Sequence, residues 1–79
     1  MEETRPRGTR PDAITRDAFY LLKRVPSLHA TYQVRLLTYL ALQQDKKLVI
    51  RVPLRFEPAP SLRAYMERFT STIHIEHMG

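Results

Sequence analysis

The side chains best suited to chemistry in this sequence are its cations. Thirteen Lys and Arg residues stand against eight Asp and Glu residues among 79, which gives a net charge of +5. The segment 46–56 contains no acidic residue and carries Lys46, Lys47, Arg51 and Arg55. Clustered Lys and Arg side chains are what phosphate oxygens of nucleic acids bind. We therefore expect these four side chains to contact nucleic acid or an acidic protein partner.

Two further groups of basic residues extend this candidate site. One is an N-terminal arm with Arg5, Arg7 and Arg10, and the other comprises Arg16, Lys23 and Arg24 around the aromatic Tyr20. Arginines can follow a phosphate backbone, and an exposed aromatic ring can stack on a base. Such contacts would position a nucleic acid without reading its sequence. The competing interpretation is that Glu76 pairs with one arginine and that the other cations are simply solvated on an outer face.

The residue patterns of the common enzyme classes are missing from this sequence. It has no cysteine, and its two glycines, Gly8 and Gly79, cannot form a glycine-rich phosphate loop. The serines fit helix caps or strand ends, and the carboxylates do not cluster as general acid–base catalysis requires. We predict a non-enzymatic protein without a cofactor.

The strongest metal-binding candidate is the C-terminal group His74, Glu76 and His77. On a strand, His74 and Glu76 share one face while His77 points to the other, so the three cannot reach one ion. His29 is remote in sequence. The sequence therefore predicts no metal site.

Two helices are predicted in the first half of the chain. Beginning at Asp12 or Thr15, apolar residues recur at helical spacing up to Val25, and Thr15 suits the N-cap position. From Ser27, as N-cap, to Gln44 the sequence is apolar nearly all round a helix, which predicts burial on two sides. The short link at Pro26 predicts that the two helices pack as a hairpin.

In the second half, the hydrophobic period changes to two. Residues 48–56 alternate as a half-buried strand does, and Pro53 predicts an edge strand or one whose second half is unpaired on one side. Ser61 suits the cap of a short helix, and the alternation returns over 71–78. If the two strands are parallel neighbours, their crossover should be right-handed.

These elements predict an α+β fold in the order α-α-β-α-β, with a two-helix N-terminal hairpin packed on a small C-terminal β-α-β unit. We expect residues 1–11 to form a flexible basic tail and residues 12–79 a single domain. A chain of this size has a marginal core, and without cysteine it has no disulfide to support it. We therefore expect a homodimer through a sheet edge as one means of support.

The function predicted from these features is a small basic binding or regulatory module that uses a basic strand face and the N-terminal arm to hold nucleic-acid phosphates. The alternative is a protein–protein adaptor or inhibitor that acts through a sheet edge or an apolar helix flank. The sequence has no apolar signal or membrane-spanning segment, so the expected location is the cytoplasm.

Overall fold

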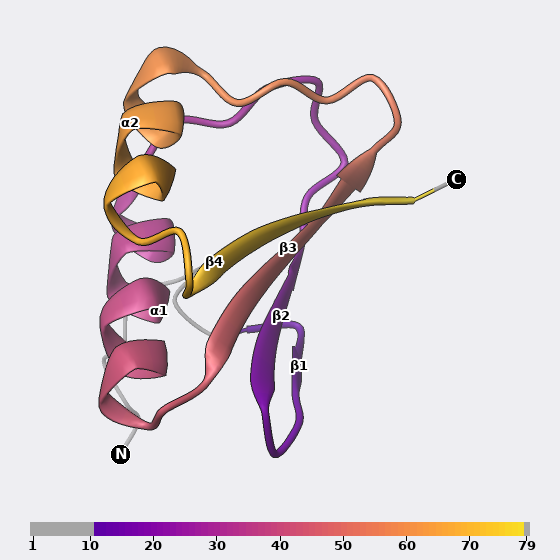
Figure 1. The fold of residues 1–79 in the computed structure, drawn as a ribbon. Helices are drawn as coiled ribbons and strands as arrows, with labels where there is room; N and C mark the ends of the chain where they lie inside the picture. Colours follow the sequence, from indigo (N-terminus) through magenta and orange to yellow (C-terminus); the bar gives the residue numbers. More distant parts are fainter. Residues whose placement is uncertain (1–10, 79) are drawn as a thin grey trace, which may run out of the picture.

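The computed structural model describes residues 11–78, which form a four-stranded mixed sheet covered by two helices (Figure 1). The elements in chain order are β1 (Ala13–Ile14), β2 (Ala18–Leu22), α1 (Tyr32–Gln43), β3 (Lys47–Pro53), α2 (Pro60–Arg68) and β4 (Ile73–Met78). The sheet order is β1-β2-β3-β4. The predicted order α-α-β-α-β is therefore wrong, since the observed order is β-β-α-β-α-β. The predicted tail, except Pro11, lies outside the described residues.

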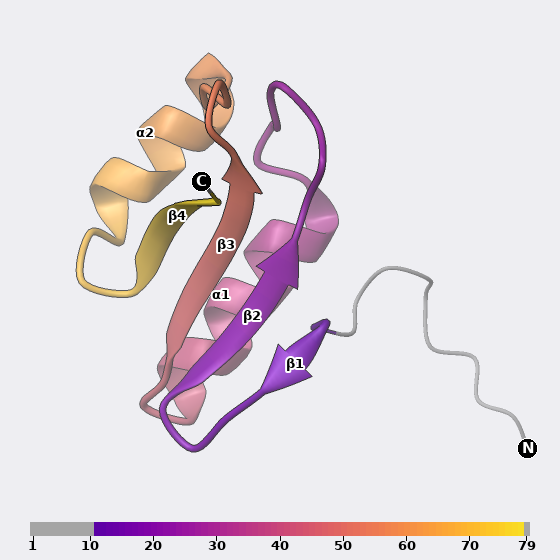
Figure 2. The ribbon, with the colours of Figure 1, turned by 90° about the vertical axis from the view of Figure 1, so that its right-hand side faces the viewer.

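Both helices lie on the same side of the sheet. β2 pairs in parallel with β3, and β3 pairs in parallel with β4, so α1 and α2 are the two crossover connections. Each crossover is right-handed, as the twist of strands dictates, and each therefore places its helix behind the sheet in Figure 2. The other face of the sheet is covered by no helix or strand in the part of the chain that the structure describes.

A hairpin stands where the first helix was predicted. The hydroxyl of Thr15 accepts a hydrogen bond from the Ala18 amide at 3.1 Å, and the Thr15 amide donates to the Ala18 carbonyl at 2.8 Å. A Thr hydroxyl that accepts a hydrogen bond from the third following amide also caps helices. The local pattern at Thr15 therefore predicts this hydrogen bond correctly, but the bond closes a turn instead of starting a helix. β1 then pairs with β2 antiparallel, and β2 is held on its other side by β3.

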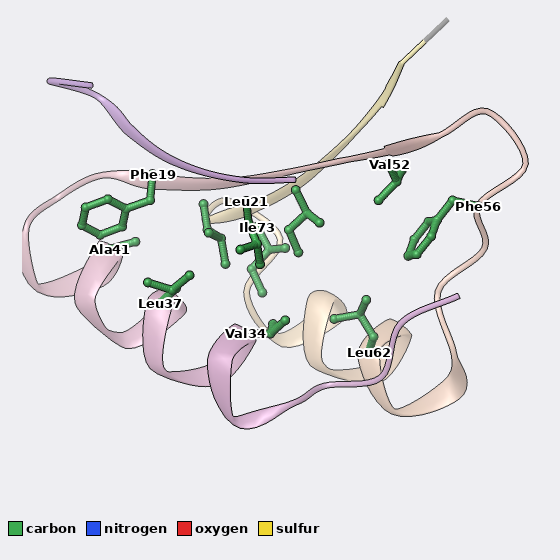
Figure 3. Close-up of a cluster of buried hydrophobic side chains, with 11 residues drawn as sticks. Phe19, Leu21, Val34, Leu37, Ala41, Val52, Phe56, Leu62 and Ile73 are labelled. Carbon is green, nitrogen blue, oxygen red and sulfur yellow. The ribbon is translucent and has the colours of Figure 1, made fainter. Parts of the chain in front are cut away.

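The hydrophobic core lies between the sheet and the helices (Figure 3). Strand side chains that point towards the helices meet the inner sides of α1 and α2. The core residues are Phe19, Leu21, Val34, Leu37, Ala41, Leu48, Ile50, Val52, Phe56, Leu62 and Ile73. Leu54, which the alternation placed inside, is 66% exposed because β3 ends at Pro53 and the chain turns there.

Helix α1 is shorter and less buried than its sequence predicted. Its N-cap is Thr31, whose hydroxyl accepts from the Val34 amide, so Ser27 caps nothing here. Only the stripe that faces the sheet is buried. The opposite side is exposed at Tyr32 and Tyr39, at 56% and 57%. The predicted burial on two sides is therefore wrong for the chain alone.

The end of α1 is formed by a left-handed residue. Asp45 has φ 59°, its amide bonds the Leu42 carbonyl at 3.3 Å, and the Lys46 amide bonds the Ala41 carbonyl at 2.8 Å. This is the Schellman arrangement, in which Asp stands where glycine is usual. The reversal leads directly into β3.

Pro53 is the last residue of β3, which is an interior strand. The pairing with β2 ends at Arg51, so Pro53 lies beyond the last β2 partner and its missing N–H leaves no β2 carbonyl unpaired. Of the two interpretations of Pro53, the edge strand is wrong and the strand unpaired on one side in its second half is right.

The start of α2 differs from the prediction in one contact. Its N-cap is Ala59 with Pro60 in the first turn, while the Ser61 hydroxyl accepts a hydrogen bond from the Ala30 amide at 3.0 Å. Ser61 therefore ties the loop before α1 to α2 instead of capping its own helix.

Candidate functional site

The uncovered side of the sheet is a surface to which all four strands contribute. Residues paired in register share a face, so alternate positions of each strand point away from the helices. We call this surface the open face (Figure 2). It consists of Ala13, Ala18, Tyr20, Leu22, Lys47, Val49, Arg51, Pro53, His74, Glu76 and Met78.

An ion pair occupies the middle of the open face. The Arg51 Nε lies 2.8 Å from the Glu76 Oε1, and the two residues are register partners on β3 and β4. Their side chains are 47% and 52% exposed. A pair this exposed stabilises the chain by at most about 1 kcal/mol. Its larger effect is on charge, because Glu76 neutralises the arginine that the sequence offered as a phosphate contact.

A shallow hollow of about 490 Å³ lies on the β1 side of the open face. It is lined by Asp12, Ala13, Thr15, Tyr20, Leu22, Arg51 and Glu76. The Asp12 Oδ2 accepts a hydrogen bond from the Leu22 amide at 2.6 Å, which holds the rim of the hollow against β2. The hollow therefore combines apolar walls with one cation and two carboxylates.

The predicted basic strand face is not assembled. Arg55 lies in the turn after β3 and not on the strand. The Lys46 Nζ donates to the Thr15 carbonyl at 2.8 Å and lies 4.8 Å from the centre of the Phe19 ring. Of the four expected contacts, only Lys47 and Arg51 are on the open face, and Arg51 is paired.

The second predicted group is divided between the two ends of β2. Arg16 lies in the turn that precedes this strand, and Lys23 and Arg24 follow it. Tyr20 is on the open face and half-buried, so it is not an exposed aromatic among cations. Arg5, Arg7 and Arg10 lie outside the described residues.

Three of these cations lie on loops at the same end of the sheet. Lys23 and Arg24 follow β2, and Arg55 follows β3, so all three lie at the carboxyl ends of parallel strands. Hydrogen bonds join the two loops: the Lys23 amide donates to the Arg51 carbonyl at 2.9 Å, and the Glu57 amide donates to the Pro26 carbonyl at 3.0 Å. We call Lys23, Arg24 and Arg55 the edge cluster. The edge cluster was not predicted, because it forms only if residues 18–22 are a parallel strand. Had that strand been recognised, the cluster would have been a candidate, since the carboxyl ends of parallel strands are the usual ligand site of such sheets.

A second exposed apolar surface lies on α1. Tyr32, Leu36 and Tyr39 follow helical spacing on the side opposite the sheet, and the Gln43 Nε2 donates to the Tyr39 hydroxyl at 2.9 Å. These residues belong to the broader of the two apolar sides of the helix, which the sequence predicts to pack against a sheet. The smaller stripe of Val34, Leu37 and Ala41 makes that contact instead.

Within residues 11–78, no three His, Cys, Asp or Glu side chains lie close enough to hold a metal ion. Neither α1 nor α2 has the length and apolar character needed to cross a membrane. Comparison with protein-family models, curated proteins and solved structures finds no significant match to this chain.

Proposed function

We propose that this chain is a protein-interaction module and that another polypeptide covers its open face. The observation that carries the proposal is a sheet with three parallel strands that, within residues 11–78, has helices on one face only. Sheets built from parallel strands are nearly always covered on both faces. The proposed location is the cytoplasm, because a chain without cysteine fits a reducing compartment.

The composition of the open face supports this function over nucleic-acid binding at the same place. Its apolar members come from all four strands and surround the Arg51–Glu76 pair. Interfaces between proteins combine apolar and aromatic groups with Arg in this way. Phosphate binding at this face is less favoured, because Glu76 pairs with Arg51, the central arginine of the face.

Site-specific photo-cross-linking tests the proposal. A photo-reactive phenylalanine analogue in place of Val49, at the centre of the open face, should give one discrete adduct in cells that make the protein. The same analogue in place of Arg63, which is exposed on α2, should give none. The Val49 adduct should disappear when Leu22→Glu places an extra charge on the face. Equal adducts from both positions would overturn the proposal.

A second candidate function has its own observation in the edge cluster. Lys23, Arg24 and Arg55 lie on loops joined by hydrogen bonds, at the edge where parallel sheets bind ligands. We propose that this cluster, rather than the strand face, contributes phosphate contacts if the chain binds nucleic acid. Contacts of this kind release counterions, so affinity falls steeply as salt rises.

Electrophoretic mobility of DNA and RNA probes at two salt concentrations tests this second function. The triple variant Lys23→Glu, Arg24→Glu, Arg55→Glu should abolish a salt-sensitive shift. The matched variant Arg35→Glu, Arg63→Glu, Arg68→Glu has the same net charge but alters the helices, and it should lower the affinity much less. Equal losses would show that only net charge matters. The absence of any shift at low salt would remove nucleic acid as a ligand.

A further inference from the structure

We infer that a second copy of this chain packs face to face on the part of the open face that β3 and β4 form, about a two-fold axis. This inference rests on the proposed function and names its partner. It is carried by the charge and the register of the open face.

The charge of the open face favours a partner that is neither strongly acidic nor strongly basic. Lys47 and Arg51 on the face are balanced by Glu76 and by Asp12 at its rim. The positive surplus of the chain therefore lies elsewhere, on the helices and loops. An acidic partner would meet no net positive charge here, whereas a second open face is equally neutral and brings no like-charge repulsion across the contact.

The register makes this face self-complementary. Arg51 and Glu76 lie at the same level on neighbouring strands. A two-fold axis that runs along the strands between β3 and β4 places Arg51 opposite Glu76 of the second copy, and places Glu76 opposite Arg51 of that copy. A closed two-fold contact requires such reciprocal pairs. The same rotation places the apolar Pro53 opposite Met78 of the second copy. It brings only β3 and β4 opposite strands of that copy, so the contact is made by these two strands.

Residues 1–10 have little apolar area with which to cover the face in place of a copy. Residues 1–10 read MEETRPRGTR and contain Met1 as their only large apolar side chain. An apolar sheet face is stabilised by burial of apolar area, which such a segment cannot supply. A chain of 79 residues without disulfides is also of the size for which oligomerisation commonly supports a small core.

The expected dimer is weak because the face is small. A spacing of about 4.8 Å between strands and a rise of about 3.3 Å per residue give the two contacting strands a flat extent of about 10 Å by 20 Å. Standard interfaces bury about 800 Å² on each partner, so this contact is smaller than a standard interface. We expect a dissociation constant in the micromolar range or weaker, and the measurement must extend to about 1 mM.

Sedimentation equilibrium of charge-reversed variants tests the inference. The wild-type chain should approach twice its mass of 9.3 kDa as its concentration rises. Arg51→Glu makes the face acidic and Glu76→Arg makes it basic, so each variant alone should self-associate at least about tenfold more weakly because like charges oppose each other. An equimolar mixture of the two should regain the dimer mass, because an acidic face then meets a basic one.

Two control variants locate the contact. Arg63→Glu changes the net charge by as much as Arg51→Glu but lies on α2, and it should leave the dimer intact. Tyr39→Glu alters the exposed side of α1 and should also leave it intact. A monomer at about 1 mM would overturn the inference. So would loss of the dimer in Tyr39→Glu, or a mixture that fails to restore it. If the wild type is monomeric but cross-links from position 49 to a different protein, the inference fails while the proposed function stands.

Discussion

Ile50→Asp is expected to prevent folding, whereas Val49→Asp, one residue earlier in the same strand, is expected to leave the chain folded. Ile50 is fully buried between β3 and the helices, and a carboxylate there would have no partner. The free energy of unfolding of a domain of this size is about 4–12 kcal/mol, and burial of an unpaired charge costs more than that. Val49 lies on the open face and is half-buried, so a carboxylate at that position remains in contact with water.

Circular dichroism and urea denaturation of the two variants measure this contrast. The Val49→Asp variant should keep the wild-type spectrum and lose about 1 kcal/mol of unfolding free energy, the usual span of strand preferences. Equal damage from the two substitutions would mean that both faces of β3 are covered within a single chain, and the open face would then not exist.

Leu37→Ala is expected to lower the free energy of unfolding by about 2–5 kcal/mol, because it leaves a cavity in a packed core. Leu37 is fully buried against the sheet, while Tyr39, on the same helix, is 57% exposed. Tyr39→Ala should therefore change the unfolding free energy by about 0.5 kcal/mol or less.

Chemical denaturation of both α1 variants at low protein concentration checks this difference. Leu37→Met, which nearly conserves the volume, should recover most of the loss and cost less than about 1.5 kcal/mol. A loss at Tyr39 comparable to that at Leu37 would mean that the outer side of α1 is buried too. The two-sided burial predicted from the sequence would then hold for the chain by itself.

The sequence was informative where one periodicity dominated. The alternation of Leu48, Ile50 and Val52 predicted the buried side of β3, and the apolar spacing around Leu62 predicted α2. In both elements the polar residues leave a single apolar side, so the local pattern agrees with the tertiary packing.

The sequence failed where several apolar residues were consecutive. Residues 18–22, AFYLL, fit a helical period and a strand equally well, because a short apolar run has no clear period. These residues form a strand because they pair with β3, which lies about thirty residues later in the chain. A pairing over that distance leaves no pattern in the local sequence. The hairpin turn at Thr15 added to the error, since its hydroxyl makes the same contact in a turn as in a helix cap.

Those errors also displaced the candidate site. With residues 12–25 as a helix, Arg16, Tyr20, Lys23 and Arg24 shared one side. As a hairpin they are distributed over both ends of β2 and the open face. The competing interpretation of the basic residues predicts that Glu76 pairs with one arginine, and the structure contains the Arg51–Glu76 pair. The open face itself was not predicted, because it depends on residues 18–22 forming a third parallel strand, whose crossover puts α1 on the same side of the sheet as α2.

The most direct test of the open face as a contact between two copies is a dilution series followed by NMR from about 1 mM downwards. The methyl signals of Val49 and Met78 should shift with concentration, because these side chains are on the part of the open face that β3 and β4 form. The methyl signals of Leu36 and Leu42 on α1 should stay in place. Shifts confined to α1, or no shift at any concentration, would contradict self-association through the open face.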